Sequence, residues 1–216
     1  MKNSTLTLLL VSVMMVNAAC NNQANEQAME TESKIDSTTQ EATALPGKEP
    51  VPSNLELKNI SFDIQTKGNG SIKKLNVQSH GLENDQKFEM DLEGELTDSL
   101  VTDLNADEFP ELVLFTRSAG SGSYGNVIAF SVNNGKSMSR VYFPPVSENP
   151  KLKEGYMGHD RFFIQDSKLM QEFPIYKKTD PNSDPTGGVR RIEYKLVDGE
   201  ASRKFVSEKI SDSATK

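Results

Sequence analysis

The sequence has one cysteine and two histidines, and its only long apolar run is too short to cross a membrane. A lone cysteine, Cys20, cannot form a disulfide within the chain, so the folded part must be stabilised by an apolar core. His80 and His159 lie far apart in the sequence, and with no usable thiol beside them they supply too few ligands for a zinc site. We therefore expect neither a metal nor a cofactor.

The N-terminal residues have the pattern of an export signal. Lys2 is followed by an apolar run of about eleven residues at 6–16, and then by small residues that lead to Cys20. This arrangement resembles a bacterial lipoprotein signal, in which residues 1–19 are removed and Cys20 carries lipid. We expect a membrane-anchored protein in the periplasm or at the cell surface, and Asn21 after the cysteine favours the outer membrane by analogy. An ordinary signal peptide with a spare thiol is the alternative.

The charge balance is acidic, with a formal net charge of −7. An acidic surface disfavours nucleic acid and suits a basic partner. Export would also place the protein where ATP and NAD are scarce, which argues against enzymes that depend on them.

Composition divides the chain into segments. Residues 20–54 are rich in Gln, Asn, Glu, Ser, Thr and Pro and contain almost no large apolar side chains, so we expect a disordered tether. Residues 55–210 are long enough for one folded domain. We expect the remainder, residues 211–216, to be frayed.

Within 55–210 the apolar residues alternate with polar ones, as in "KFEMDLEGEL", and Gly, Asn and Asp clusters separate the runs. Asp198-Gly199 has the sequence of a two-residue hairpin turn. No window has a long helical period. The sequence therefore predicts an all-β fold, an antiparallel β-sandwich with few or no helices.

The stretch "SAGSGSYGNV" contains glycines at positions 120, 122 and 125, the spacing of a nucleotide-phosphate loop. A dinucleotide loop must be followed by a helix, but the β-branched and aromatic run "NVIAFSV" follows it here. A kinase loop would need further motifs that the sequence lacks. We expect a long hairpin loop instead, in which glycines allow positive φ and several side chains are available for contact: Ser118, Ser121, Ser123 and Tyr124.

A resemblance to a known family rests on this loop and its surroundings. "DLNADEFPELVLFTRSAGSGSYGNVIAFSVNNGKSMSRVYFPPV", with "GYMGHD", "FPIY" and "PTGG" after it, resembles the periplasmic inhibitors of invertebrate-type (I-type) lysozyme. The similarity extends over about residues 62–210, and its most specific part is the Ser-Gly-x-Tyr motif. Two departures are Glu108, where a glycine would be usual, and the long N-terminal tether.

The resemblance implies a β-sandwich, a possible homodimer, and an I-type lysozyme as the protein partner. It also implies that Ser121 and Tyr124 enter the enzyme's active cleft, within a binding loop formed by Ser118, Gly120, Ser121, Gly122, Ser123 and Tyr124. The chemistry is consistent, because a lysozyme cleft holds two carboxyl groups and hydroxyl donors bind carboxylates well. Such an inhibitor has no catalytic residue of its own.

Other motifs leave alternatives open. "DLNADEFPE" places Asp103, Asn105, Asp107 and Glu111 much as a calcium loop would, although an Asn/Asp-rich turn has the same composition. Arg190 and Arg191 should point to opposite faces of a strand and form no single patch. Nothing marks a pair of catalytic carboxylates. The second functional hypothesis is an envelope module on the same sandwich that binds glycan or another protein without inhibiting it.

Overall fold

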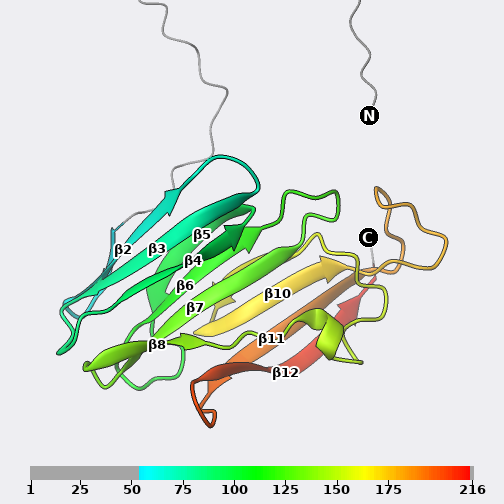
Figure 1. Ribbon diagram of the computed structural model, residues 1–216. Coiled ribbons are helices and arrows are strands. Elements are labelled where there is room, and N and C mark those ends of the chain that lie inside the picture. The colour runs from blue at the N-terminus through cyan, green and yellow to red at the C-terminus, as the bar shows by residue number, and fades with distance from the viewer. Residues whose placement is uncertain (1–53, 215–216) are drawn as a thin grey trace, which may run out of the picture. The chain divides into compact units, whose positions relative to one another are not determined.

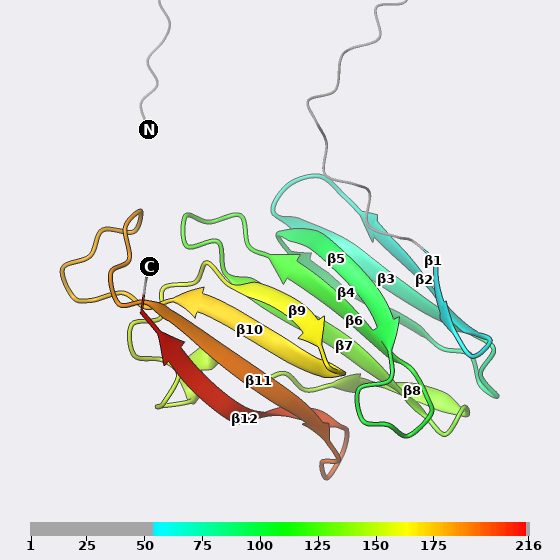
Figure 2. The same cartoon turned by 180° about the vertical axis from the view of Figure 1, so that it is seen from behind.

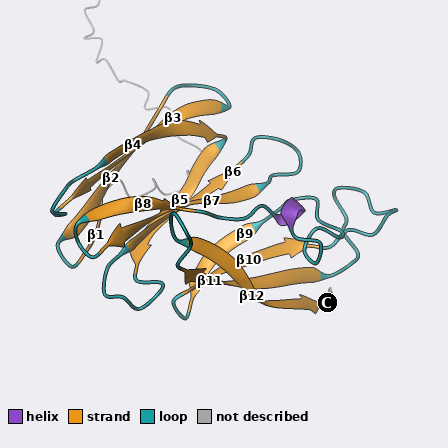
Figure 3. Cartoon of the chain, turned by 60° about the horizontal axis from the view of Figure 1, so that its bottom comes forward, coloured by secondary structure: helices purple, strands orange, loops and turns teal. Residues whose placement is uncertain are grey.

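The computed structural model describes residues 54–214, so Cys20, the export signal and most of the tether lie outside the described residues. Within them the chain forms antiparallel strands and one short 3-10 helix, η1 (Val146–Glu148), visible in Figure 3. This confirms the all-β prediction. The strands are β1 (Asn54–Leu57), β2 (Ile60–Lys67), β3 (Ile72–His80), β4 (Lys87–Glu93), β5 (Glu95–Thr102), β6 (Glu111–Arg117), β7 (Gly125–Asn133), β8 (Ser137–Val141), β9 (Arg161–Gln165), β10 (Lys168–Pro174), β11 (Val189–Val197) and β12 (Lys204–Ser213).

The strands form three antiparallel four-stranded sheets, and each sheet is one continuous stretch of chain (Figures 1 and 2). We call them the first sheet (β1-β2-β3-β4), the middle sheet (β5-β6-β7-β8) and the third sheet (β12-β11-β10-β9). The sandwich thus has one layer more than the sequence analysis anticipated.

The middle sheet is covered on both faces. From β6, Leu112 and Leu114 pack into a core with the first sheet, whereas Val113 and Phe115 pack into a second core with the third sheet. Successive side chains of a strand point to opposite faces, so the central residues of a strand with two buried faces are apolar without alternation, as residues 112–115 are here. The run "ELVLFT" is buried throughout for this reason.

The chain changes sheets directly after β8. The N–H of Tyr142 donates to the carbonyl oxygen of Arg203 at 2.9 Å, and the N–H of Phe205 donates to the carbonyl oxygen of Tyr142 at 2.9 Å. Tyr142 therefore lies alongside β12 of the third sheet, and β8 ends after only five residues. Because of this crossing, β8 pairs with only the second part of β7, from Ala129 onward.

One turn prediction was wrong. Asp198-Gly199 does not form a two-residue hairpin turn, because the last pair between β11 and β12 is Val197 with Lys204 and residues 198–203 connect them. The longer connection positions Arg203, whose guanidinium group lies among carboxylates of the middle sheet and its loops. None of the helices within residues 54–214 is long and apolar enough to cross a membrane.

Candidate functional site

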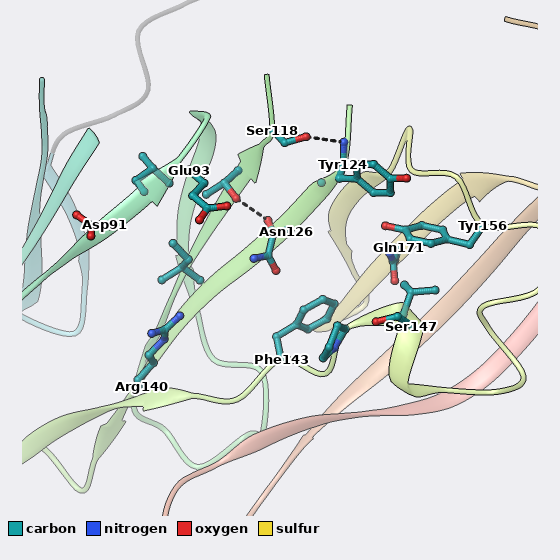
Figure 4. A pocket seen from close by; sticks show the side chains of 16 residues that line it. Asp91, Glu93, Ser118, Tyr124, Asn126, Arg140, Phe143, Ser147, Tyr156 and Gln171 are labelled. Atoms are coloured by element: carbon teal, nitrogen blue, oxygen red, sulfur yellow. Dashed lines mark hydrogen bonds between the residues drawn. The ribbon is translucent and has the colours of Figure 1, made fainter. Parts of the chain in front are cut away.

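The glycine-rich stretch forms the connection between β6 and β7, residues 118–124, and a strand follows it as the sequence predicts. Two hydrogen bonds close its base: the N–H of Ser118 donates to the carbonyl oxygen of Tyr124 at 2.8 Å, and the N–H of Tyr124 donates to Ser118 Oγ at 3.0 Å (Figure 4). Ser118 therefore stabilises the loop at its base. We call residues 118–124 the inhibitory-type loop, after the family it resembles.

Neither loop glycine has positive φ, which corrects the expectation from the sequence, and only Gly122 is required for space. The residue with positive φ is Ser123, at 44°, and its N–H donates to the carbonyl oxygen of Gly120 at 2.9 Å. A side-chain carbon on Gly122 would collide with the ring of Tyr124, whereas one on Gly120 would meet nothing within 4 Å. The pairing of Gly122 with Tyr124 thus has a steric cause.

Two other connections of the domain contact this loop. The N–H of His159 donates to the carbonyl oxygen of Gly122 at 2.8 Å, and the Asn182 side-chain amide donates to the carbonyl oxygen of Ser121 at 3.2 Å. Gly158 lies so close that any side chain there would collide with the Gly122 carbonyl oxygen. The loop and the segment around Asn182 project at the same end of the domain (Figure 1).

Tyr124 presents its ring at the surface and is 47% exposed. Its inner edge lies against Tyr156, with the ring centroids 5.7 Å apart, and Tyr156 in turn packs on Phe173 at 4.7 Å. The side chain of Ser121 is exposed at the outer part of the loop. The two residues that the resemblance places in a lysozyme cleft are therefore accessible, and the tyrosine is held in position by aromatic packing.

A buried carboxylate supports the loop from below. Asp160 is 2% exposed, and its Oδ2 accepts hydrogen bonds from the N–H of Gly125 at 2.9 Å and from the Tyr156 hydroxyl at 2.8 Å. Its Oδ1 accepts from the Gln171 amide at 2.6 Å, and Gln171 Oε1 accepts from the Tyr194 hydroxyl at 2.7 Å. The network joins the end of the loop to the third sheet.

Burial sets the protonation of this network. Loss of solvation raises the pKa of Asp160, although the N–H of Gly125 and the side chains of Gln171 and Tyr156 oppose the shift by donating hydrogen bonds. Burial, and then the neighbouring Asp160 carboxylate, raise the pKa of Tyr156 far above its ordinary range, so its hydroxyl remains a donor. Sequence analysis missed these residues. The available signal was the polar Gln171 between Leu169 and Phe173, the apolar residues on the same face of β10.

The Asp103–Glu111 motif forms a closed turn whose oxygens are used within the protein. Asp103 accepts from the N–H groups of Asp107 and Glu108 at 3.2 and 2.9 Å, and Glu111 Oε2 accepts from the N–H of Leu104 at 2.8 Å. Glu108 has a φ of 73°, which explains why a glycine would be usual at this position.

A guanidinium group supplies the positive charge in this turn. Arg203 donates to Asp107 Oδ2 at 2.6 Å, lies 3.5 Å from Glu111 Oε1, and also donates to the hydroxyl of Ser131. Within residues 54–214 no group of three or more His, Cys, Asp or Glu side chains is arranged to hold a metal ion. The turn interpretation of the motif therefore fits the geometry better than a calcium site.

The two histidines and the arginine pair, Arg190 and Arg191, form no common site. His80 contacts Asp63 at 3.1 Å on the first sheet, whereas His159 lies beside the inhibitory-type loop, so the two histidines share no site. Arg190 binds Asp212 and Arg191 binds Glu172, as expected for neighbours that point to opposite faces of a strand.

Comparison with known families gives one finding. Residues 89–143 match the family model of the periplasmic lysozyme inhibitor of I-type lysozyme. The matched segment runs from β4 to the crossing after β8 and contains the whole inhibitory-type loop. The match confirms the resemblance to this family over residues 89–143, which are part of the longer stretch, about residues 62–210, over which the sequence resembles it. A comparison with curated proteins gives no match.

Proposed function

We propose that this protein inhibits an I-type lysozyme by inserting the inhibitory-type loop into the active cleft of the enzyme. Tyr124 supplies the main contact area, and the hydroxyl groups of Tyr124 and Ser121 donate hydrogen bonds to the carboxyl groups that line the cleft. The loop excludes the substrate, so the inhibitor needs no catalytic group.

The observation that carries the proposal is the exposed ring of Tyr124 on a loop that is fixed at three places. Ser118 closes the base of the loop, and the N–H of His159 binds a carbonyl oxygen within it. Asp160 binds the N–H of the residue that follows the loop. A loop that is ordered before binding loses little conformational entropy when it enters a cleft. A large ring that is rigid and exposed is also typical of residues that dominate binding energy.

Inhibition assays test the proposal directly. Purified protein is added to I-type, chicken-type and goose-type lysozymes, and lysis of bacterial cells is followed. We expect inhibition of the I-type enzyme at stoichiometric amounts. Absence of inhibition of every lysozyme, together with retention of the protein on cell-wall glycan, would instead support the non-inhibitory binding module.

We also propose that the mature protein is lipid-anchored through Cys20 and that the anchor places the domain at the outer membrane. Support comes from the apolar run and small residues that precede the single cysteine. Cells that express the full chain are labelled with a radioactive fatty acid. We expect label in the wild-type protein and none in Cys20→Ala, and equal labelling of both would exclude this anchor.

A further inference from the structure

The first half of β7 has a neighbouring strand on one side only. β6 pairs with β7 along its length up to Gly125, whereas β8 pairs only with the part from Ala129 to Asn133. The chain then crosses to the third sheet at Tyr142 instead of continuing along β7. Among the strands of residues 54–214, none pairs with one backbone edge of residues 125–128.

The backbone N–H groups on this open edge donate hydrogen bonds to side chains. The N–H of Val127 donates to Oδ1 of Asn126 at 2.8 Å, and the N–H of Gly125 donates to Asp160. An unpaired edge is a template for an added strand, and proteins commonly blunt it by local means. The Asn126 side chain is exposed and can rotate away, so the donor of Val127 becomes available to an incoming strand without any change in the sheet.

A groove of about 620 Å³ follows the open edge. Figure 4 shows Asn126 projecting from β7 into it, with Glu93 of β4 on one side and Phe143 and Tyr156 on the other. The groove thus lies between the first sheet and the segment that leads into the third sheet. An extended segment beside residues 125–128 would span about 14 Å of this edge. The N–H of Val127 is the donor that it can use, because the N–H of Gly125 is held by Asp160.

Arg140 gives the groove a chemical preference. It lines the groove from β8, it is exposed, and its guanidinium group has no hydrogen bond or ion pair with any residue of 54–214. Every other arginine in residues 54–214 has such a partner. A guanidinium group binds carboxylates in a planar, two-bonded geometry, so Arg140 favours an acidic side chain at its own part of the groove. Asp91 and Glu93 of β4 also line the groove and disfavour an acidic side chain beside β4, so the preference is local to Arg140.

We propose that the open edge of β7 binds an extended segment of the target lysozyme as an added strand, with an acidic side chain of that segment paired to Arg140. This inference rests on the proposed function. Addition of a strand to a sheet edge is a common mode of recognition, in which backbone bonds give affinity and side-chain pockets give specificity. Ser118 and Tyr124 of the loop also line the groove, so a protein that receives the loop also lies against the groove.

Charge reversal tests the role of Arg140. Binding of the I-type lysozyme is measured by titration calorimetry for the wild-type protein, Arg140→Glu, Arg140→Lys and Lys136→Glu. Lys136 is exposed at the other end of the β7–β8 hairpin, and its reversal changes the net charge equally. We expect Arg140→Glu to weaken binding at least tenfold, Arg140→Lys to weaken it less, and Lys136→Glu to leave it within twofold of the wild type.

Filling the groove tests the added strand. Ser147 is exposed on η1 and lines the groove, so Ser147→Trp obstructs the groove, and Ser211→Trp on β12 is the matched control. We expect Ser147→Trp to weaken binding and Ser211→Trp to leave binding unchanged. Hydrogen exchange at the Val127 amide should also slow when the enzyme binds, because a backbone acceptor replaces the mobile side chain of Asn126.

The outcomes separate this inference from the function on which it rests. If the wild-type protein inhibits no lysozyme, the proposed function and this partner are both overturned. If the wild type inhibits but Arg140→Glu and Ser147→Trp bind like their controls, the function stands and the groove proposal is overturned. If these two variants change self-association in sedimentation instead of enzyme binding, the groove holds a second copy of this chain and the proposal is likewise overturned.

Discussion

Tyr124 and Gly122 form a steric pair within the inhibitory-type loop. The ring occupies the place that a side chain at position 122 would need, and the ring of Tyr156 packs against it. The exposed face of the ring is thereby fixed in one orientation. A loop of small residues can be stiff when a single aromatic ring fills the space that its glycines leave.

Removal of the Tyr124 ring should weaken inhibition strongly. We expect Tyr124→Ala to reduce the free energy of binding to an I-type lysozyme by roughly 2–4 kcal/mol, the range of an interface hot spot. Tyr124→Phe keeps the ring and tests the hydroxyl alone, and Ser121→Ala should cost less than Tyr124→Ala. Inhibition constants from lysis assays give these values. Unchanged inhibition by both alanine variants would remove the loop from the mechanism.

Two glycines of the same loop provide a matched comparison. Gly122→Ala forces the Tyr124 ring to move, and strain of this kind typically costs roughly 1–3 kcal/mol. Gly120→Ala adds the same methyl group in open space. We therefore expect Gly122→Ala to weaken inhibition about tenfold or more and Gly120→Ala to leave it almost unchanged. Equal effects of the two substitutions would contradict the steric explanation.

At the scale of elements, several segments of the chain hold the loop in position. The β6–β7 hairpin provides its two ends, but the acceptor for Gly125 comes from Asp160 and the donor to Gly122 comes from His159. Both residues immediately precede β9, the first strand of the third sheet in chain order. An isolated hairpin with the same sequence would lack these contacts.

Asp160→Asn should loosen the loop. The substitution keeps the shape of the side chain, but its amide nitrogen faces a donor in place of an oxygen that now accepts hydrogen bonds. Buried polar groups that lose a partner typically cost about 1–3 kcal/mol. We expect lower stability in urea, faster hydrogen exchange at Gly125 and weaker inhibition. Full inhibition by a folded Asp160→Asn would show that this carboxylate does not position the loop.

Period-two alternation identified the strands because side-chain direction in a strand follows directly from local backbone geometry. The run "ELVLFT" was recognised as a strand, and the loop after it was placed correctly. The same run also carried evidence of two buried faces, since its four central residues, "LVLF", are apolar without alternation. The Asp160 network could not be predicted, because its members come from separate segments that only tertiary packing brings together.

At the scale of the whole molecule, Glu111 makes stability depend on pH. It is fully buried at the start of β6, and burial raises its pKa from 4.5 to about 7. Hydrogen bonds donated by Leu104 and Ser131 lower this pKa but do not cancel the effect of burial. A carboxyl group with a raised pKa in the folded state favours folding when protonated. Its contribution is therefore complete below about pH 4.5 and is lost as the pH rises through about 7.

We expect the protein to be less stable near pH 8.5 than near pH 5, by up to about 3 kcal/mol from this group. Asp160 contributes in the same direction, because burial also raises its pKa. Urea unfolding at the two pH values measures the difference. Glu111→Gln should reduce it, since the amide stays neutral throughout. A stability that rises over this interval in the wild-type protein would contradict the assignment.

Each sheet is a continuous stretch of chain, and their order in sequence is also their order in space, with the middle sheet second. A polypeptide that enters a compartment from its N-terminus would deliver these layers one after another. The hairpin that bears Tyr124 would then emerge before the aspartate that anchors it. We expect truncation before residue 160 to leave a chain with the recognition motif intact and the inhibitory geometry absent.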